Sequence, residues 1–574
     1  MRLDARTALE CHEYLHKFNA PKRFDLSGAI EEDDLVKEYK RQGLLHEEKV
    51  KDFLRTLPLK VVTIAEDQGD EVAQELTARA LIDPSIDIIL GAHISAHCEG
   101  ILATLTKNEK LNDPSRVSRP DLLIRTDDAP KWAPVDIKLH TAFDDSNKSN
   151  QVFVSRWQAH LPEHGIPLTG KISEEDGIQL AHYHQHLTNL GFASDDFLVA
   201  IIGREYEAIT WARLDQTKKR SGKNVPNYLN IYYEDFLSAE QIVKQARERN
   251  NNPEIAPPSR PQLISGKFGC DMCTYKYICR DELEKFDNNA GHVTLLAKVS
   301  PDIAARHFPD IESIRELAMA TNLSEIGEKA RRRAQVWLSK KPMLLDPNEP
   351  LEIPEFDIEV DIDLENSQAL LEEILPGEHM PDDRVYLYGY GIHDRTKDKD
   401  WRSADIHSIY DFANTDEAEY KVLTEMWSKL EELVSTAKKE NKSIGIFHYS
   451  PHERTWWKRF ARRFEGKSNV PTLEHVEAFM SKYFVDLLEY SRKVALPLTG
   501  YSIKLLAPYA GFHWSVENAG GATSLLKYRD ATNPSTPDPA KLAAQEWLIS
   551  YNRDDVRATY AARNHLRELE LPKN

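Results

Sequence analysis

Four prolines between residues 340 and 356 divide this chain into two parts. Because proline ends helices and is excluded from central strands, the segment KKPMLLDPNEPLEIPEF is typical of a linker between domains. Helix and strand patterns alternate before it and start again at Phe356. A chain of 574 residues is also too long for one hydrophobic core. We therefore expect an α/β multidomain protein.

The first half mixes the two kinds of pattern. Residues 31–57 have apolar positions three and four apart, which predicts a helix, and residues 177–192 predict a second helix that ends at Gly191. Short runs rich in β-branched residues, such as DLLIRT, APVDIKL and FLVAIIG, predict strands. The predicted organisation is an α/β domain over 1–285, a helical connector over 286–340 and a second α/β domain over 341–574.

Composition indicates an ordinary cytoplasmic protein. Apolar residues make up 41% of the chain, and the mean hydropathy is −0.55. No run of 18 apolar residues is present, and the first residues, MRLDARTALECHEYLHK, lack the apolar centre of a signal peptide. Five cysteines are too few for a secreted disulfide scaffold of this length. The net charge of −19 does not exclude nucleic acid, because metal-binding carboxylates and a basic groove can coexist.

Three of the five cysteines lie within ten positions. Cys270, Cys273 and Cys279 follow a C-x2-C-x5-C spacing, and the other two thiols are Cys11 and Cys98. Zinc and iron–sulfur clusters each usually take four ligands, so a fourth must come from elsewhere. Zinc with a histidine ligand remains open on spacing alone. The alternative to a metal site is that these cysteines are ordinary small apolar side chains. The surrounding Gly, Asp and Lys disfavour this alternative.

Carboxylates in the first domain suggest a metal site. Asp121 begins one predicted strand, and Asp136 and Lys138 lie on the next, two residues apart and therefore on one face. Two carboxylates can hold Mg²⁺ or Mn²⁺, and a lysine beside them can orient a water for attack on a phosphodiester. A lone D-x-K is a weak signal, since surface strands often carry it.

Neighbouring helices add three more candidates. His46, in GLLHE, could add a metal ligand, although a histidine alone is more often structural. Gln179 and Tyr183 share one helical face at i and i+4, where a half-buried helix surface is the simpler interpretation.

In this order, G-x-x-H-E, R-P-D, D-x-K and Q-x-x-x-Y resemble the RecB-like branch of the PD-(D/E)xK nuclease superfamily. The resemblance covers about half of the chain and implies a restriction-endonuclease-like core. It implies that His46, Asp121 and Asp136 hold the metal, that Lys138 serves the water, and that the Gln179 and Tyr183 side chains shape the site and contact DNA. Asp136 stands where glutamate is common, and the superfamily allows both.

The cysteines extend this resemblance. AddB-type members carry one cysteine before the nuclease core and C-x2-C-x5-C after it, and together these bind a 4Fe–4S cluster. Here Cys11 matches the early position, and Cys270, Cys273 and Cys279 match the late ones. Cys98 is then a thiol that is not a ligand.

Acids in the second domain suggest another metal site. FDIEVDIDL predicts a strand with Asp357 and Glu359 on one face, and a helix near the end places Tyr551 four residues before Asp555. A solvated edge strand could also show D-x-E. A D-x-E strand followed by a Y-x3-D helix resembles the DEDD exonuclease branch of the RNase H-like superfamily.

In that branch four acids bind two metal ions, and the tyrosine helps to position the water. The remaining acid is normally an aspartate after a strand, and Glu453 is its best match here. This departure puts the activity of the second domain in doubt. Asp486 is another candidate, with a supporting role more expected.

Together these patterns predict a restriction-endonuclease-like RecB nuclease core and an RNase H-like domain, joined by a small helical region. The expected function is metal-dependent hydrolysis of DNA, with exonuclease action expected, in repair, recombination or defence. DNA is the expected partner, with a helicase or other repair protein in trans and no membrane. A nucleic-acid-binding scaffold with decayed sites and an RNA-directed nuclease are the alternatives. The near-match to a phosphate loop, GIPLTGKI, has Ile172 where Ser or Thr should bind Mg²⁺, which excludes an ATPase.

Overall fold

The chain forms two compact units. The computed structural model describes residues 2–29, 34–65, 69–108, 111–127, 129–143, 151–204, 206–216, 218–220, 223–225, 227–263, 270, 273–367, 383–397 and 406–571. One unit comprises Met1–Pro261, and the other comprises Gln262–Leu370 with Pro381–Asn574. None of the helices within these described ranges is long and apolar enough to cross a bilayer.

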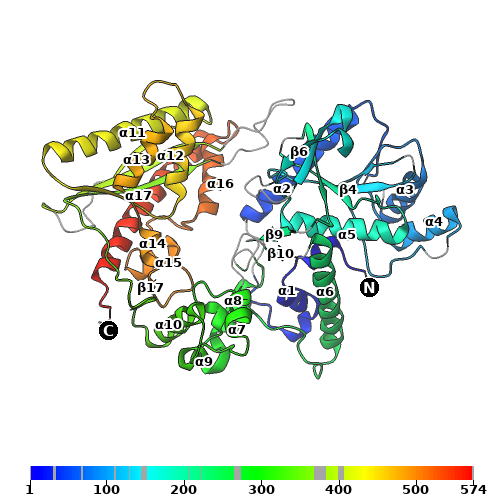
Figure 1. Ribbon diagram of the computed structural model, residues 1–574, viewed down its shortest axis with the longest axis horizontal. Helices are drawn as coiled ribbons and strands as arrows, with labels where there is room; N and C mark the ends of the chain where they lie inside the picture. The colour runs from blue at the N-terminus through cyan, green and yellow to red at the C-terminus, as the bar shows by residue number, and fades with distance from the viewer. Residues whose placement is uncertain are drawn as a thin grey trace. The chain divides into compact units, whose positions relative to one another are not determined.

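The first unit is built on an eight-stranded sheet with helices packed around it (Figure 1). The strand order is β1-β2-β3-β4-β7-β8-β5-β6. The strands are β1 (Val61–Thr63), β2 (Ile88–Leu90), β3 (Leu122–Arg125), β4 (Trp132–Ile137), β5 (Gln151–Arg156), β6 (Ile166–Thr169), β7 (Leu198–Ile202) and β8 (Ala208–Arg213), with a separate hairpin of β9 (Lys218–Arg220) and β10 (Lys223–Val225). The helices are α1 (His12–Asn19), α2 (Asp34–Arg55), α3 (Asp70–Ile82), α4 (Ala96–Thr106), α5 (Glu174–Leu190) and α6 (Tyr228–Asn251).

The centre of this sheet follows from its apolar strands. β3 and β4 pair antiparallel, and β4 pairs parallel with β7 after the chain has passed through α5. Helix α5 begins where the Ser173 hydroxyl caps the Asp176 N–H, and it ends at Gly191 with a positive φ of 81°. Side chains of β4 are buried on both faces, as expected for a strand at the middle of a covered sheet.

The second unit contains a five-stranded sheet of order β14-β13-β12-β15-β16. Strands β12, β13 and β14 are antiparallel neighbours, whereas β15 pairs parallel with β12 and β16 pairs parallel with β15. The strands are β12 (Ile358–Asn366), β13 (Val385–Asp394), β14 (Ile406–Tyr410), β15 (Ile444–His448) and β16 (Phe484–Asp486). The helices are α11 (Asp416–Lys439), α12 (His452–Arg463), α13 (Leu473–Tyr483), α14 (Leu487–Ser491), α15 (Ile503–Tyr509), α16 (Gly521–Thr532) and α17 (Asp538–Glu568).

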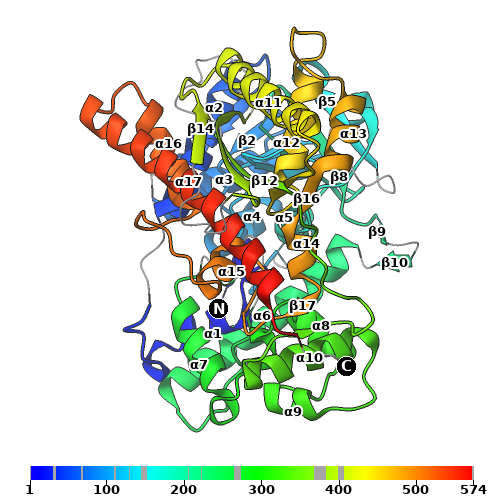
Figure 2. The same cartoon turned by 90° about the vertical axis from the view of Figure 1, so that its left-hand side faces the viewer.

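Strand β12 presents different chemistry on its two faces. Val360, Ile362 and Leu364 enter an apolar core that α11, α12 and α13 help to form. The alternating acids point to the other face, where the long helix α17 packs against β12 and β13. Figure 2 shows α16 alongside the N-terminal part of α17. At Gly389 a Cβ atom would collide with the Asn552 side chain, so glycine allows α17 to approach the sheet this closely.

A small helical region belongs to the second unit. It contains α7 (Lys276–Asn289), α8 (Pro301–His307), α9 (Ile314–Met319) and α10 (Glu325–Ser339). The short strand β11 (Met343–Leu344) pairs antiparallel with β17 (Val494–Ala495). The predicted linker thus joins the second unit through a strand, and the units divide at Pro261/Gln262 rather than near residue 285.

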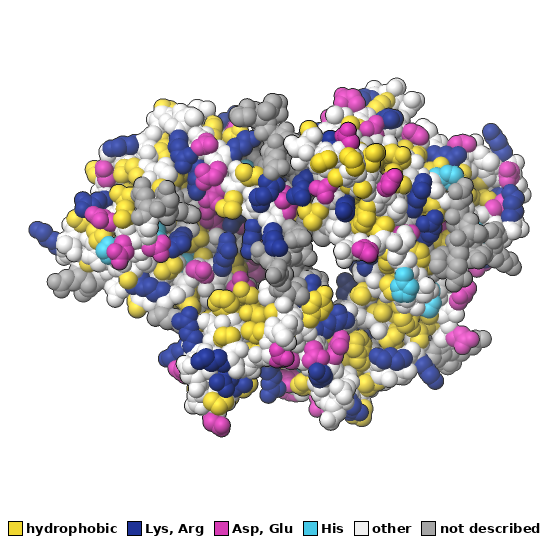
Figure 3. All heavy atoms as spheres, turned by 180° about the vertical axis from the view of Figure 1, so that it is seen from behind, with side chains coloured by type: hydrophobic (Ala, Val, Ile, Leu, Met, Phe, Trp, Pro, Cys, Tyr) yellow, Lys and Arg dark blue, Asp and Glu magenta, His cyan; other side chains and the backbone are white. Residues whose placement is uncertain are grey.

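The surface carries both signs of charge. On the face shown in Figure 3, basic and acidic side chains are interspersed. The net charge of −19 is therefore not a uniform acidic coat on this face.

Buried charges fasten α17 to β12. Arg563 is fully buried and pairs with Glu359 and with Asp361, whose Oδ2 lies 2.6 Å from Arg563 Nη2.

We expect Arg563→Met to lower the free energy of unfolding by about 3–5 kcal/mol, because the substitution leaves buried carboxylates without their ion-pair partner. Urea unfolding measures this loss. Arg553→Met is the matched control, since Arg553 is exposed on the same helix, and an equal loss in both variants would contradict the prediction.

Candidate active sites

Three carboxylates meet where β12 ends against α17. Asp363 and Glu365 come from β12, and Asp555 comes from α17. One oxygen of each lies within 4.8 Å of the others, a group that could hold a metal ion. Among the described residues, no other set of three His, Cys, Asp or Glu side chains meets this criterion. An all-oxygen set of carboxylates suits Mg²⁺ or Mn²⁺.

These are not the strand acids expected from the sequence. The Asp357 carboxylate instead accepts hydrogen bonds of 2.8 Å from the Ser443 N–H and hydroxyl. Glu359 is buried in ion pairs with Arg563 and Arg567. The expectation that Asp357 and Glu359 join Asp555 is therefore wrong.

The physical reason for this error is register. D-x-E occurs twice in FDIEVDIDLEN, six residues apart, and all the acids alternate onto the same face. Only the packing of α17 decides which pair meets Asp555, and it selects Asp363 and Glu365.

Asp555 itself is held by two donors. Lys504 Nζ and Trp514 Nε1 each lie 2.6 Å from Asp555 Oδ1. Tyr551, one helical turn earlier, interacts with the same carboxylate, so the predicted Tyr551 and Asp555 do lie together. The Tyr551 ring also stacks on Trp547, with centroids 5.0 Å apart.

Sequence reasoning missed three further residues at this site. Asn552 Nδ2 donates to Asp363 Oδ2 at 2.7 Å. Asn552 could have been predicted from the sequence, because it lies three residues before Asp555 on α17 and so on the same helical face. Lys504 and Trp514 come from a different part of the chain, and no local pattern singles them out.

Burial and mutual repulsion disfavour the charged forms of these acids. Burial and the Asp555 charge raise the pKa of Glu365 to about 8. The pKa of Asp363 is raised well above its usual range by burial and by Asp555, Glu365 and Glu453. The pKa of Asp555 is also raised by burial, although Lys504 opposes this. Such a cluster favours a cation that would offset the repulsion.

Glu453 and Asp486 lie elsewhere in the same unit. Glu453 is 3% exposed in the first turn of α12, and its Oε2 lies 3.3 Å from His448 Nδ1. Its charge acts on Asp363, but it is outside the group of three. Asp486 Oδ1 accepts from the Ser450 and Leu488 N–H groups and caps α14, which is a structural role.

In the first unit, a hairpin brings the predicted acids together. The antiparallel pairing of β3 and β4 puts Asp121 beside the end of β4, where its Oδ2 accepts from the Ile137 N–H at 2.6 Å. Lys138 Nζ lies 3.2 Å from Asp136 Oδ2. The other carboxylate oxygen of the fully buried Asp136, Oδ1, has no hydrogen-bond partner. An unsatisfied buried oxygen of this kind fits a metal ligand.

Helix α5 completes the surroundings of Lys138. Lys138 Nζ donates to Gln179 Oε1 at 2.9 Å, and Gln179 Nε2 donates to the Tyr183 hydroxyl at 3.1 Å. Asp176, which sequence reasoning missed, lies 3.7 Å from Lys138 Nζ and 3.3 Å from His140 Nε2. Asp176 could have been predicted from the sequence, because it lies one helical turn before Gln179 and so on the same face of α5.

His46 hydrogen-bonds backbone groups beside the site. Its Nε2 lies 3.1 Å from the Gly203 carbonyl oxygen, and the ring also bonds to the backbone of Lys138. The adjacent Glu47, which sequence reasoning missed, is a helix acid whose charge acts on both Asp121 and Asp136. Its Oε1 pairs with Lys51 Nζ.

The same electrostatic signature marks this site. Burial, Asp136 and Glu47 raise the pKa of Asp121 to about 8. Burial also raises the pKa of Asp136. Burial alone would lower the pKa of Lys138, but the surrounding carboxylates outweigh it and raise the pKa.

None of the five cysteines forms a disulfide bond. Cys270, Cys273 and Cys279 surround the start of α7, and the Tyr275 N–H donates to Cys273 Sγ at 3.4 Å. Residues 264–269, 271 and 272 of this loop lie outside the described residues. Cys11 belongs to the other unit. Cys98 is fully buried, and burial raises the pKa of its thiol to about 12.

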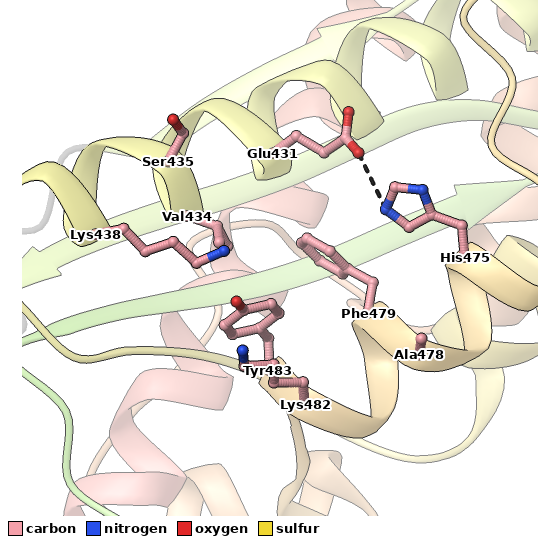
Figure 4. Close-up of a pocket in the computed structure, with 9 residues that line it drawn as sticks. All are labelled: Glu431, Val434, Ser435, Lys438, His475, Ala478, Phe479, Lys482 and Tyr483. Carbon is pink, nitrogen blue, oxygen red and sulfur yellow. Dashed lines mark ion pairs between the residues drawn. The ribbon is translucent and has the colours of Figure 1, made fainter.

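A pocket of about 340 Å³ lies apart from both acidic clusters (Figure 4). It opens between α11 and α13, and its one acidic side chain, Glu431, pairs with His475 at 3.3 Å. Lys438 and Lys482 flank the Tyr483 ring at this pocket. It lacks the grouped carboxylates of a metal site.

Comparison with known proteins agrees with the second unit. A family model described as RNase H superfamily (RNase_H_2) matches residues 380–567. The second unit carries an RNase H-like domain. The match includes Glu453, Tyr551 and Asp555 and begins after β12, which carries Asp363 and Glu365. No curated protein and no solved structure matches the chain.

Glu365 gives this domain a pH-dependent stability. Between its ordinary pKa of 4.5 and the raised value of about 8, the folded state keeps a proton that the unfolded state has released. The metal-free protein should therefore lose stability as pH rises through this range. Glu365→Gln should be more stable than the parent chain at pH 8 and similar to it at pH 5. Thermal unfolding in EDTA measures this, and an equal difference at both pH values would contradict it.

Proposed function

We propose that this protein is a metal-dependent nuclease that hydrolyses phosphodiester bonds in DNA. The observation that carries the proposal is the group of Asp363, Glu365 and Asp555, two of them half-buried and the third buried, on the sheet of the RNase H-like domain. RNase H-like folds support metal-dependent cleavage of nucleic acids, and the donor set fits Mg²⁺ or Mn²⁺.

In the second unit, Asp363, Glu365 and Asp555 would hold the cation. Divalent cations at such sites activate water and stabilise the leaving oxygen. Asn552 orients the Asp363 carboxylate, and Tyr551 lies where it can position a water.

We infer a second nuclease site of the RecB-like, restriction-endonuclease type in the first unit. Its support is the β3–β4 hairpin followed by α5 and the parallel strand β7, with one unsatisfied Asp136 oxygen and the other beside Lys138. Asp121 and Asp136 would hold the cation with His46, and Glu47 is a further candidate ligand because its charge acts on both acids. Lys138, held by Gln179, would orient the attacking water.

DNA ends are the proposed substrate, with exonuclease action in repair, recombination or defence and a helicase or other repair protein as partner. The specific support is the RecB-like motif set, which is a DNA-nuclease pattern. An RNA-directed nuclease and a binding scaffold are the competing functions. Labelled single- and double-stranded DNA and a matching RNA, each with Mg²⁺ or Mn²⁺, distinguish the three.

We further propose that Cys11, Cys270, Cys273 and Cys279 bind a 4Fe–4S cluster. The C-x2-C-x5-C spacing and the N–H donated to Cys273 Sγ fit soft-metal ligation. Such a cluster would join segments about 260 residues apart in the sequence.

Two single substitutions should separate the nuclease sites. In a Lys138→Ala chain, which lacks the first activity, Asp363→Ala should abolish the remaining metal-dependent cleavage. Asp357→Ala is the matched control and should leave the remaining cleavage intact. Asp357 shares the acidic side of this segment, but its carboxylate bonds to Ser443. Release of label from 5′- and 3′-labelled DNA measures the rate. Loss in both variants, or in neither, would overturn the assignment of Asp363.

The first site has its own test. In an Asp363→Ala chain, Asp136→Ala and Lys138→Ala should each remove the remaining cleavage while leaving folding nearly intact. Circular dichroism checks the fold. Cleavage at the undiminished rate in either double variant would place the first activity elsewhere.

The cluster makes a distinct prediction. Protein purified without oxygen should be brown and contain about four irons per chain. Cys11→Ala should lose the colour and destabilise the first unit, whereas Cys98→Ala should keep the colour. Metal analysis that finds zinc without iron, or a colourless Cys98→Ala protein, would refute the ligand assignment.

A further inference from the structure

A lysine ammonium lies against the acidic cluster of the second unit. Lys504, on α15, places Nζ 2.6 Å from Asp555 Oδ1. Its ammonium also lies 4.0 Å from the centre of the Trp514 ring and 4.3 Å from that of Tyr551. Cation–π contacts on two sides and an ion pair define one position for this charge.

The charge of Lys504 acts on the whole cluster. It lowers the energy of the ionised forms of Asp363, Glu365 and Asp555 alike. Three carboxylates and one ammonium carry a net charge of two negative units, which one divalent cation neutralises. The remaining acid, Glu453, is instead directed to His448.

We propose that Lys504 acts as the second cation of this site, so that the three carboxylates bind one divalent metal ion rather than two. The proposal rests on the proposed nuclease function and specifies its mechanism. Two-metal sites place positive charges about 3.5–4 Å apart, on both sides of the scissile phosphate. Lys504 supplies one of these charges from the chain itself, and its ammonium contacts a phosphate oxygen of the substrate.

A purely structural ion pair between α15 and α17 is the competing explanation. It predicts that removing Lys504 changes stability without changing how many metal ions bind. Metal stoichiometry therefore separates the two explanations.

The experiment counts Mn²⁺ ions bound to the full chain by calorimetry. Asp121→Asn with Asp136→Asn gives a background without first-site binding. This background should bind one Mn²⁺ per chain, and adding Lys504→Met should raise the number to two, because the vacated charge is replaced by metal. Cleavage should fall on the order of 100-fold, as for loss of one charge-stabilising group. Lys504→Arg should keep one Mn²⁺.

Lys493→Met is the matched control. The Lys493 side chain is 30% exposed and pairs with Glu349 at 2.8 Å, and the Lys504 side chain is 31% exposed. This control should bind one Mn²⁺ and cleave at the background rate.

The outcomes distinguish the two proposals. One Mn²⁺ in both the background and the Lys504→Met variant, or two in both, overturns the role of Lys504 and leaves the nuclease function standing. A background that binds no Mn²⁺, like an added Asp363→Asn variant, overturns the proposed function and this inference with it. If Lys504→Met fails to fold, Lys504→Arg is measured instead. Two Mn²⁺ ions bound to Lys504→Arg would contradict the proposal.

Discussion

The packing of α17 against the acidic face of β12 determines the chemistry of the second unit. Burying a row of carboxylates is costly unless opposite charges offset it. Arg563 and Arg567 offset it at the start of the strand, where Glu359 and Asp361 form ion pairs with them. At the other end of the strand, Lys504 is the cation whose charge acts on Asp363 and Glu365. One strand thus carries a structural charge cluster and an unsatisfied one, and the unsatisfied cluster is the candidate metal site.

The first unit reaches a similar arrangement by a different route. A β-hairpin, rather than a helix on a strand, brings its two acids together, and the lysine comes from the same strand end as Asp136. In both units grouped carboxylates with raised pKa values lie beside one lysine. Perturbed acids next to a fixed cation are typical of catalytic sites, although structural clusters can share this signature. The arginine-saturated end of β12 illustrates that second case.

Local patterns predicted some of these residues well. D-x-K within one strand and Y-x3-D within one helix involve neighbours whose spacing fixes a common face, and the structure keeps each pair together. D-x-E failed because two copies share one face of one strand, and nothing within the strand distinguishes them. His46 stays a prediction, and the adjacent Glu47 adds a charge that acts on both acids. Lys504 and Trp514 had no local signal, because they meet Asp555 through folding alone.

The sequence by itself determined the two α/β patterns, the RNase H-like character of residues 380–567 and the kinds of side chain available for metal binding. Periodicity carries this information because it depends only on neighbouring residues. Tertiary structure decided which acids act together and which are neutralised. It also made the predicted linker part of the second unit, because β11 pairs with β17. The reason is that charge compensation in a buried site depends on distances across the fold, and the placement of α17 and α15 sets those distances.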